Sequence, residues 1–250
     1  MSLLRSLLAC LLLVPMAARA GEVAVAVAAN FTAPMKRIAE GFAQATGHRA
    51  VLSFGSTGKL YAQIHNGAPF EVLLAADSAT PEKLEAEGLA VEGTRFTYAV
   101  GQLALWSADA GLVDADGEVL QSGGFERLAV ADAKLAPYGR AARQTLEHLG
   151  LAEALKPRLV TAESIGQSYQ FVASGNASLG FVALSQIWRD GQLTAGSAWR
   201  VPNGMHDPLR QDLVVLAPGE HSHAARALAA YLRSDEARDV IRSFGYEVAN

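Results

Sequence analysis

Buried strands and amphipathic helices alternate along the first third of the chain, and this alternation constrains the fold more than any other feature. A run of small and β-branched residues at 23–29 predicts a buried strand. Helical spacing follows at 33–46, with Pro34 in the first turn and Gly47 after the end. The alternation repeats twice more, up to residue 88. This rhythm predicts an α/β fold with a parallel sheet and helices on both faces.

The pattern changes at 96–108 to one long strand that contains Gly101. We interpret this strand as a crossing from one lobe to a second, and 210–218 as the strand that returns. The closing segment at 223–245 has the spacing of one helix and would pack on the first lobe. Two lobes joined by two strands form a hinged clamp, whose cleft suits a small ligand.

In the second lobe we expect strands at 127–132, 158–163 and 177–184, and helices at 140–148 and 168–173. The expected boundaries are 21–100 and 207–250 for lobe 1, and 101–206 for lobe 2.

The first 20 residues have the pattern of a secretory signal peptide. Arg5 precedes an apolar run at 7–13, and small residues at Ala18 and Ala20 form an A-x-A-like cleavage site. The apolar run is too short for a permanent membrane-spanning helix. We therefore expect an exported mature chain that begins near residue 21.

Composition narrows the class of protein further. Cys10 is the only cysteine and lies in the expected signal peptide, so the mature chain would contain no thiol. A lipid-attachment box around Cys10 is the alternative, but it would leave almost no apolar segment before the cysteine. Without Arg5 and Arg19, 19 basic side chains face 25 acidic ones, a formal charge of −6. This balance gives no support for nucleic-acid binding, which usually needs a basic face.

Neutral polar groups follow the expected strands at four strand-to-helix turns. Ligands of a doubly wound sheet bind beyond the carboxyl ends of its strands. A helix N-terminus there can hold an anion without a cationic side chain, because its first N–H groups are unpaired. A single Ser or Thr at a helix start is more often only a cap, so several turns would have to converge on one cleft. The turns offer Asn30, Thr32, Ser56, Thr57, Tyr138, Ser164 and Ser168.

The stretch SFGSTGKL at 53–60 suggests a nucleotide-binding loop but does not fit one. Ser53 stands where a P-loop needs its first glycine, and Leu60 stands where it needs a magnesium-binding hydroxyl. Gly55 and Gly58 would still let backbone N–H groups approach an anion. Lys59 is expected on a solvated helix face.

Other catalytic or metal-binding patterns are weak. No G-x-S-x-G elbow is present, and no base–nucleophile pair can be recognised, so an exported enzyme using the cleft hydroxyls stays the alternative from a different class. His221 and His223 lack a third ligand nearby and fit an exposed helix start better than a metal site.

Three segments strongly resemble the periplasmic molybdate-binding proteins of ABC transporters: VAVAANFTAPMKRIAEGF, SFGSTGKLYAQIHNGAPFEVLLAAD and ASLGFVALSQI. The resemblance extends over essentially the whole mature chain. It implies a two-lobed periplasmic-binding-protein fold (type II) that closes on molybdate or tungstate. It also implies a monomer in the periplasm that has no catalytic activity and no cofactor, and that meets an inner-membrane ABC permease.

The resemblance implies a ligand set that contains no directly bound metal ion. Asn30 stands where many members have a serine, and its amide would donate. Tyr138 and Ile165 match donor positions of the second lobe, Ile165 through its backbone N–H. Ala183 stands where many members have a tyrosine, and Tyr138 would supply a replacement donor, through its hydroxyl or its backbone N–H. The implied ligands are Ala29, Asn30, Ser56, Thr57, Tyr138 and Ile165.

Donor-only turns suit a fully deprotonated dianion such as molybdate. A phosphate site usually needs an acceptor for the proton of its ligand, and Asp132, the nearest carboxylate, fits a surface or hinge acid better. A site without Lys or Arg also avoids the cost of burying a cation. Sulfate fits the same chemistry, so a binding protein for sulfate or another tetrahedral oxyanion is the alternative.

Overall fold

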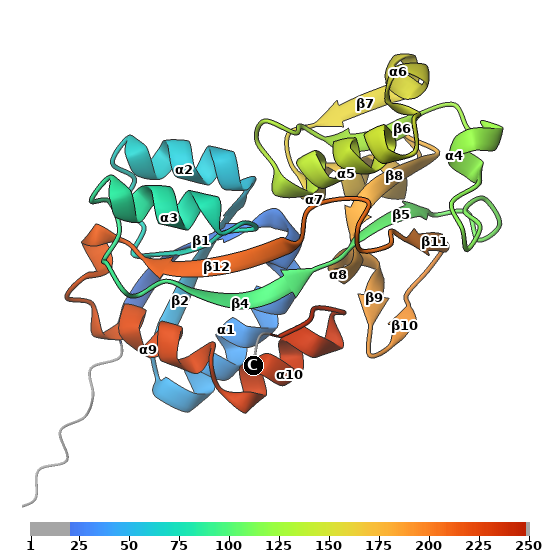
Figure 1. Ribbon diagram of the computed structural model, residues 1–250. Helices are drawn as coiled ribbons and strands as arrows, with labels where there is room; N and C mark the ends of the chain where they lie inside the picture. Colours follow the sequence, from blue (N-terminus) through green and yellow to red (C-terminus); the bar gives the residue numbers. More distant parts are fainter. Residues whose placement is uncertain (1–20, 249–250) are drawn as a thin grey trace, which may run out of the picture.

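The computed structural model describes residues 21–248, which form two five-stranded sheets flanked by helices (Figure 1). The expected signal peptide lies outside these residues. The first sheet has the strand order β2-β1-β3-β12-β4 and the second the order β11-β5-β8-β6-β7. No helix in this part of the chain is both long and apolar enough to cross a membrane. The predicted two-lobed α/β fold is confirmed.

The first sheet is parallel in one half and antiparallel in the other. Strand β1 (Glu22–Ala28) pairs in parallel with β2 (Arg49–Gly55) and β3 (Val72–Leu74), whereas β12 (Leu209–Val215) pairs antiparallel with β3 and β4 (Phe96–Gly101). The apolar faces of the helices pack on both sides, which explains the near-continuous apolar strands. On one side lie α2 (Thr57–His65) and α3 (Ala79–Ala86), and on the other α1 (Thr32–Thr46), α9 (His223–Tyr231) and α10 (Asp235–Ser243) (Figure 1).

The second sheet is mixed. Strand β8 (Leu179–Ala183) runs parallel to β6 (Leu128–Ala131) and antiparallel to β5 (Leu103–Ser107). The edge strands are β7 (Leu159–Ala162) and β11 (Ser197–Arg200). The main helices are α5 (Pro137–His148) and α7 (Ile165–Ala173), which pack against the sheet strands. Smaller elements that the sequence analysis missed are α4 (Val119–Ser122), α6 (Ala152–Leu155), α8 (Leu184–Ile187), β9 (Trp188–Arg189) and β10 (Gln192–Leu193).

The crossing between the lobes occurs where the sequence predicts it. The long strand expected at 96–108 is two strands, because β4 ends at Gly101 in the first sheet and β5 begins at Leu103 in the second. The chain returns between β11 and β12. The residue boundaries proposed for the two lobes stay a prediction.

Three predicted helix limits are wrong. The closing helix is two helices, because the Ser234 side chain accepts a hydrogen bond from Ala237 N (3.2 Å) and caps a new start. Helices α5 and α7 begin at Pro137 and Ile165, each three residues earlier than expected. Pro137 stands at the first helical position, which proline favours, so the earlier start of α5 has a clear cause. The earlier starts place the first N–H groups of both helices in the turns that face the first lobe.

The close approach of α5 to the end of β6 can be tested at Gly139. A Cβ atom there would lie 2.4 Å from the Ala131 carbonyl oxygen, so Gly139→Ala must displace the helix start. We expect this substitution to lower the free energy of unfolding by about 1–3 kcal/mol in urea titrations. Gly124→Ala is the matched control, because nothing lies within 4 Å of the added atom. Equal stability of the two variants would contradict this packing.

Candidate functional site

A small cavity between the lobes brings together all six residues that the sequence predicts as ligands. The space in it that the centre of a water-sized sphere can reach is only about 10 Å³, far below the ~300–1,000 Å³ typical of sites for drug-sized molecules. None of the described residues that line it has a charged side chain. They are Ala28, Ala29, Asn30, Ser56, Thr57, Ala76, Ala136, Pro137, Tyr138 and Ile165.

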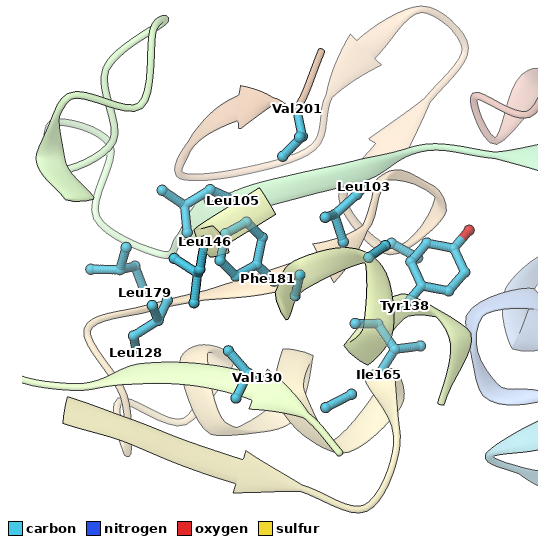
Figure 2. Packing of buried hydrophobic residues seen from close by; sticks show 14 of the residues in the cluster. Leu103, Leu105, Leu128, Val130, Tyr138, Leu146, Ile165, Leu179, Phe181 and Val201 are labelled. Carbon is cyan, nitrogen blue, oxygen red and sulfur yellow. The ribbon is translucent and has the colours of Figure 1, made fainter. Parts of the chain in front are cut away.

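Both lobes contribute to the cavity wall. Figure 2 shows Tyr138 and Ile165 at the end of the second-lobe core that faces the first lobe. Asn30 lies in the single turn η1 (Ala29–Phe31), which runs directly into α1, and Thr57 is the first residue of α2. The cavity therefore forms only where the two lobes meet.

The cavity lies at four helix starts. Asn30, Thr57, Tyr138 and Ile165 each stand in the first turn of η1, α2, α5 or α7. The first N–H groups of a helix have no partner within the helix, and the helix dipole gives this end a partial positive charge. The cavity can therefore supply several hydrogen-bond donors and a favourable potential for an anion without any cation.

Two hydroxyls add to this donor set. Ser56 is 3% exposed, and its Oγ has no hydrogen-bond partner among the described residues. Thr57 Oγ1 accepts a hydrogen bond from Ala76 N (3.0 Å), so the proton of this hydroxyl is left to donate. A buried hydroxyl without a partner is costly, and an anion in the cavity would satisfy it.

The side chain of Asn30 does not supply the donor expected of it. Its Nδ2 donates to Gln211 Oε1 (2.8 Å) and to Tyr246 Oη (2.9 Å), which uses both amide hydrogens. The donor that Asn30 can still offer the cavity is its backbone N–H. The sequence analysis missed Gln211 and Tyr246 because they are 181 and 216 residues away along the chain.

The hydroxyl of Tyr138 is also engaged outside the cavity lining. It accepts a hydrogen bond from Gln211 Nε2 (3.0 Å) and lies against Gly101, where a Cβ atom would be 2.0 Å from it. Because the Tyr138 hydroxyl accepts in this contact, its own proton is left to donate, and the backbone N–H at the start of α5 is a second donor. Ala183, which the family resemblance aligns with a tyrosine of many members, is buried and is not part of the lining.

The phenols behind the cavity stay protonated at neutral pH. Burial raises the pKa of Tyr98 and Tyr138 well above 10.0, and burial raises the pKa of Tyr246 to about 12. These three phenols therefore add no negative charge that would repel an anion.

Two ion pairs join the lobes beside the cavity. Lys59 Nζ lies 2.5 Å from Glu163 Oε2, and Arg140 Nη2 lies 2.8 Å from Asp77 Oδ2. Lys59 is thus exposed, as expected, but it pairs with the other lobe. The Lys59–Glu163 pair is exposed, and such pairs contribute little stability, about 0–1 kcal/mol, whereas the Asp77 carboxylate of the other pair is largely buried. Gly58 N also donates to Leu135 O (2.9 Å), a hydrogen bond between the first turn of α2 and the turn before α5.

Comparison with known proteins identifies similar chains. The family described as bacterial extracellular solute-binding protein matches residues 23–247. The chain is 59% identical to the molybdate-binding protein ModA of Azotobacter vinelandii over 92% of this chain and 91% of that protein. It is 50% identical to ModA of Rhodobacter capsulatus over 92% and 89% of the two chains. A solved periplasmic molybdate-binding protein of Azotobacter vinelandii matches with a TM-score of 0.89 and 41% identity, over 91% of this chain and 100% of that chain.

Removing the hydroxyl of Ser56 and removing that of Thr57 should change the stability of the ligand-free protein differently. Ser56→Ala removes an unpartnered buried hydroxyl, so we expect an unchanged or higher free energy of unfolding. Thr57→Val keeps the shape but leaves the buried Ala76 N–H unpaired, so we expect a loss of about 1–3 kcal/mol. Urea titrations of the two variants measure the difference. A larger loss of unfolding free energy for Ser56→Ala than for Thr57→Val would contradict the hydrogen bonding described for the two hydroxyls.

Proposed function

The chain belongs to the bacterial extracellular solute-binding protein family, and we propose that it captures molybdate between its two lobes and delivers it to an ABC transporter. Its most similar relatives reported above are molybdate-binding proteins, with which it shares nearly its whole length. We extend the proposal to tungstate, which has the same charge and shape.

The observation that carries the proposal is the convergence of four helix starts on a small uncharged cavity. A tetrahedral dianion without a proton needs donors on all sides and no acceptor. Backbone N–H groups of Asn30, Thr57, Tyr138 and Ile165 would surround such an ion, with the hydroxyls of Ser56 and Thr57 beside them. The orphan Ser56 Oγ supports this assignment, because a bound oxyanion would accept its hydrogen bond.

Capture would proceed by closure of the lobes on the anion. Asn30, Ser56 and Thr57 lie on one side and Tyr138 and Ile165 on the other, so the donor set is complete only in the closed arrangement. The Gly58–Leu135 hydrogen bond and the two ion pairs between the lobes would stabilise that arrangement and break on opening. Release to an inner-membrane permease then requires only that the lobes separate.

The remaining features of the proposal follow from this role. The protein would act in the periplasm as a monomer after removal of the first 20 residues, without cofactor, catalysis or nucleic-acid binding. Molybdenum would enter only as the oxyanion, so no side chain would bind the metal directly.

Calorimetric titration of the mature protein with molybdate, tungstate, sulfate and phosphate tests the function. We expect binding of molybdate and tungstate, and weakening by about 5- to 150-fold in Thr57→Ala, because a buried anion then lacks one donor worth ~1–3 kcal/mol. Ser222→Ala is the control, since the Ser222 hydroxyl also accepts a backbone hydrogen bond, from Ala225 N, but does not line the cavity. Failure of the wild type to bind molybdate and tungstate would exclude the proposal, and a preference for sulfate would favour the alternative ligand.

The affinity for molybdate should be independent of pH between about pH 6.5 and pH 9. Tyr138 is the only lining residue with an ionisable side chain, and its raised pKa keeps it neutral throughout this range. Calorimetry at several pH values measures this directly. A decline in affinity with rising pH in this range would reveal a titrating group that contacts the anion.

A further inference from the structure

The side chain of Gln211 links the two lobes directly behind the cavity. Gln211 lies on β12 and is fully buried, with 0% of its surface exposed. Its Oε1 accepts hydrogen bonds from Asn30 Nδ2 (2.8 Å) and from Tyr98 Oη (3.1 Å). Its Nε2 donates to Tyr138 Oη (3.0 Å). One amide therefore contacts a cavity residue of each lobe at the same time.

These contacts belong to a larger buried cluster, which we call the Gln211 network: Asn30, Tyr98, Tyr138, Ser185, Gln211 and Tyr246. The Asn30 carbonyl oxygen accepts from Ser185 Oγ (2.8 Å) and from Tyr246 Oη (3.0 Å). Asn30 is thus held through both its side chain and its backbone. This double restraint fixes the orientation of the turn whose N–H groups face the cavity.

The backbone around Gln211 is adapted to this network. The pairing of β12 with β4 shifts register between Gln211 and Asp212, so Tyr98 is the extra residue of a β-bulge. Bulges commonly redirect side chains next to functional sites. Gly101 leaves the space that the network fills, because a Cβ atom there would lie 2.4 Å from Gln211 Nε2. Both features stand at the strand pair that leads into the crossing between the lobes.

We propose that Gln211 is a positioning residue that couples the donors of the two lobes. It holds the Asn30 turn and the start of α5 in register, so that their backbone N–H groups reach the anion together. The inference rests on the proposed function, because it concerns the same cavity. Gln211 itself does not line the cavity and acts through Asn30 and Tyr138.

The chemistry of the coupling requires an amide. A leucine at position 211 would remove the Gln211 partner of the Tyr138 hydroxyl and one of the two partners of the Asn30 amide. The Tyr98 hydroxyl would keep its hydrogen bond to Ala75 O (3.0 Å). A protonated glutamic acid could reproduce the pattern, accepting from Asn30 and Tyr98 and donating to Tyr138. The ionised carboxylate could not donate, and its charge would repel a dianion in the adjacent cavity.

The first test compares two glutamine substitutions at the crossing between the lobes. We expect Gln211→Leu to weaken molybdate binding at least tenfold in calorimetry. Gln102→Leu is the matched control: Gln102 lies between β4 and β5 and bonds to Glu247 and Arg200, outside the network. Its affinity should stay within twofold of the wild type. Equal affinities of wild type and a folded Gln211→Leu variant would overturn the coupling.

Gln211→Glu keeps the size of the side chain and provides a test if the leucine variant does not fold. We expect its affinity to be close to that of the wild type near pH 6 and at least tenfold weaker near pH 9, since burial raises a carboxyl pKa. The titratable groups facing position 211 are Tyr98, Tyr138 and Tyr246, while Asp212, next along the strand, pairs with Arg95 (3.1 Å). A purely structural role would change stability without this pH profile of affinity.

Tyr138→Phe, alone and combined with Gln211→Leu, tests the coupling through the hydrogen bond between these two residues. The variant keeps the backbone N–H and removes the oxygen that Gln211 contacts, so we expect a loss of affinity similar to that in Gln211→Leu. The double variant should be no weaker than the weaker single variant. Failure of the wild type to bind any of the four oxyanions would overturn the proposed function and this inference together. Wild-type binding combined with unchanged affinity in all three variants would overturn the inference alone.

Discussion

The rest of this structure depends on one constraint. Hydrogen-bond donors from two separate lobes have to surround an anion without the help of a cationic side chain. The proposed donors are backbone N–H groups at helix starts, and their positions are set by the strands that precede the helices. Each turn therefore has to follow a strand of one sheet and still approach the other lobe. Gly58 shows how close this approach is, because a Cβ atom there would lie 3.0 Å from the Leu135 carbonyl oxygen.

Charge is kept at the rim of the cleft rather than in the cavity. Lys59 and Arg140 lie on the helices that form the cavity, yet both pair with carboxylates across the lobes. These pairs can guide closure without contacting the ligand. Behind the cavity the buried groups are neutral amides, hydroxyls and phenols, whose raised pKa values preserve that neutrality. A dianion thus meets oriented dipoles only, and the protein avoids the cost of desolvating a cation.

Much of the architecture could be predicted from the sequence because its signals are local. Strand-helix alternation, the crossing at Gly101 and the candidate donors in four turns all depend on neighbouring residues. The start of α5 at Pro137 was also a local signal, although the analysis placed it three residues late. The capping Ser234, which divides the closing helix, was missed in the same way.

The Gln211 network could not be predicted, because its hydrogen bonds join residues that are 61 to 216 positions apart. No local pattern distinguishes Gln211 in an apolar strand from a glutamine at the surface. The engagement of the Asn30 amide follows from the same contacts, and it leaves the backbone N–H as the group that Asn30 can offer to the cavity. Sequence patterns thus identified the residues at the cavity, whereas the direction of their side chains depends on tertiary contacts.

A crystal structure of the molybdate complex, with molybdenum located by its anomalous scattering, tests the central claim most directly. We predict one molybdenum atom in the cavity between Thr57, Tyr138 and Ile165, with oxyanion oxygens about 2.7–3.2 Å from the backbone nitrogen atoms of these residues. No Lys or Arg side chain should contact the anion, and the hydrogen bonds of Gln211 should be intact. Molybdenum at another site, or an arginine or lysine bonded to the oxyanion, would contradict the account.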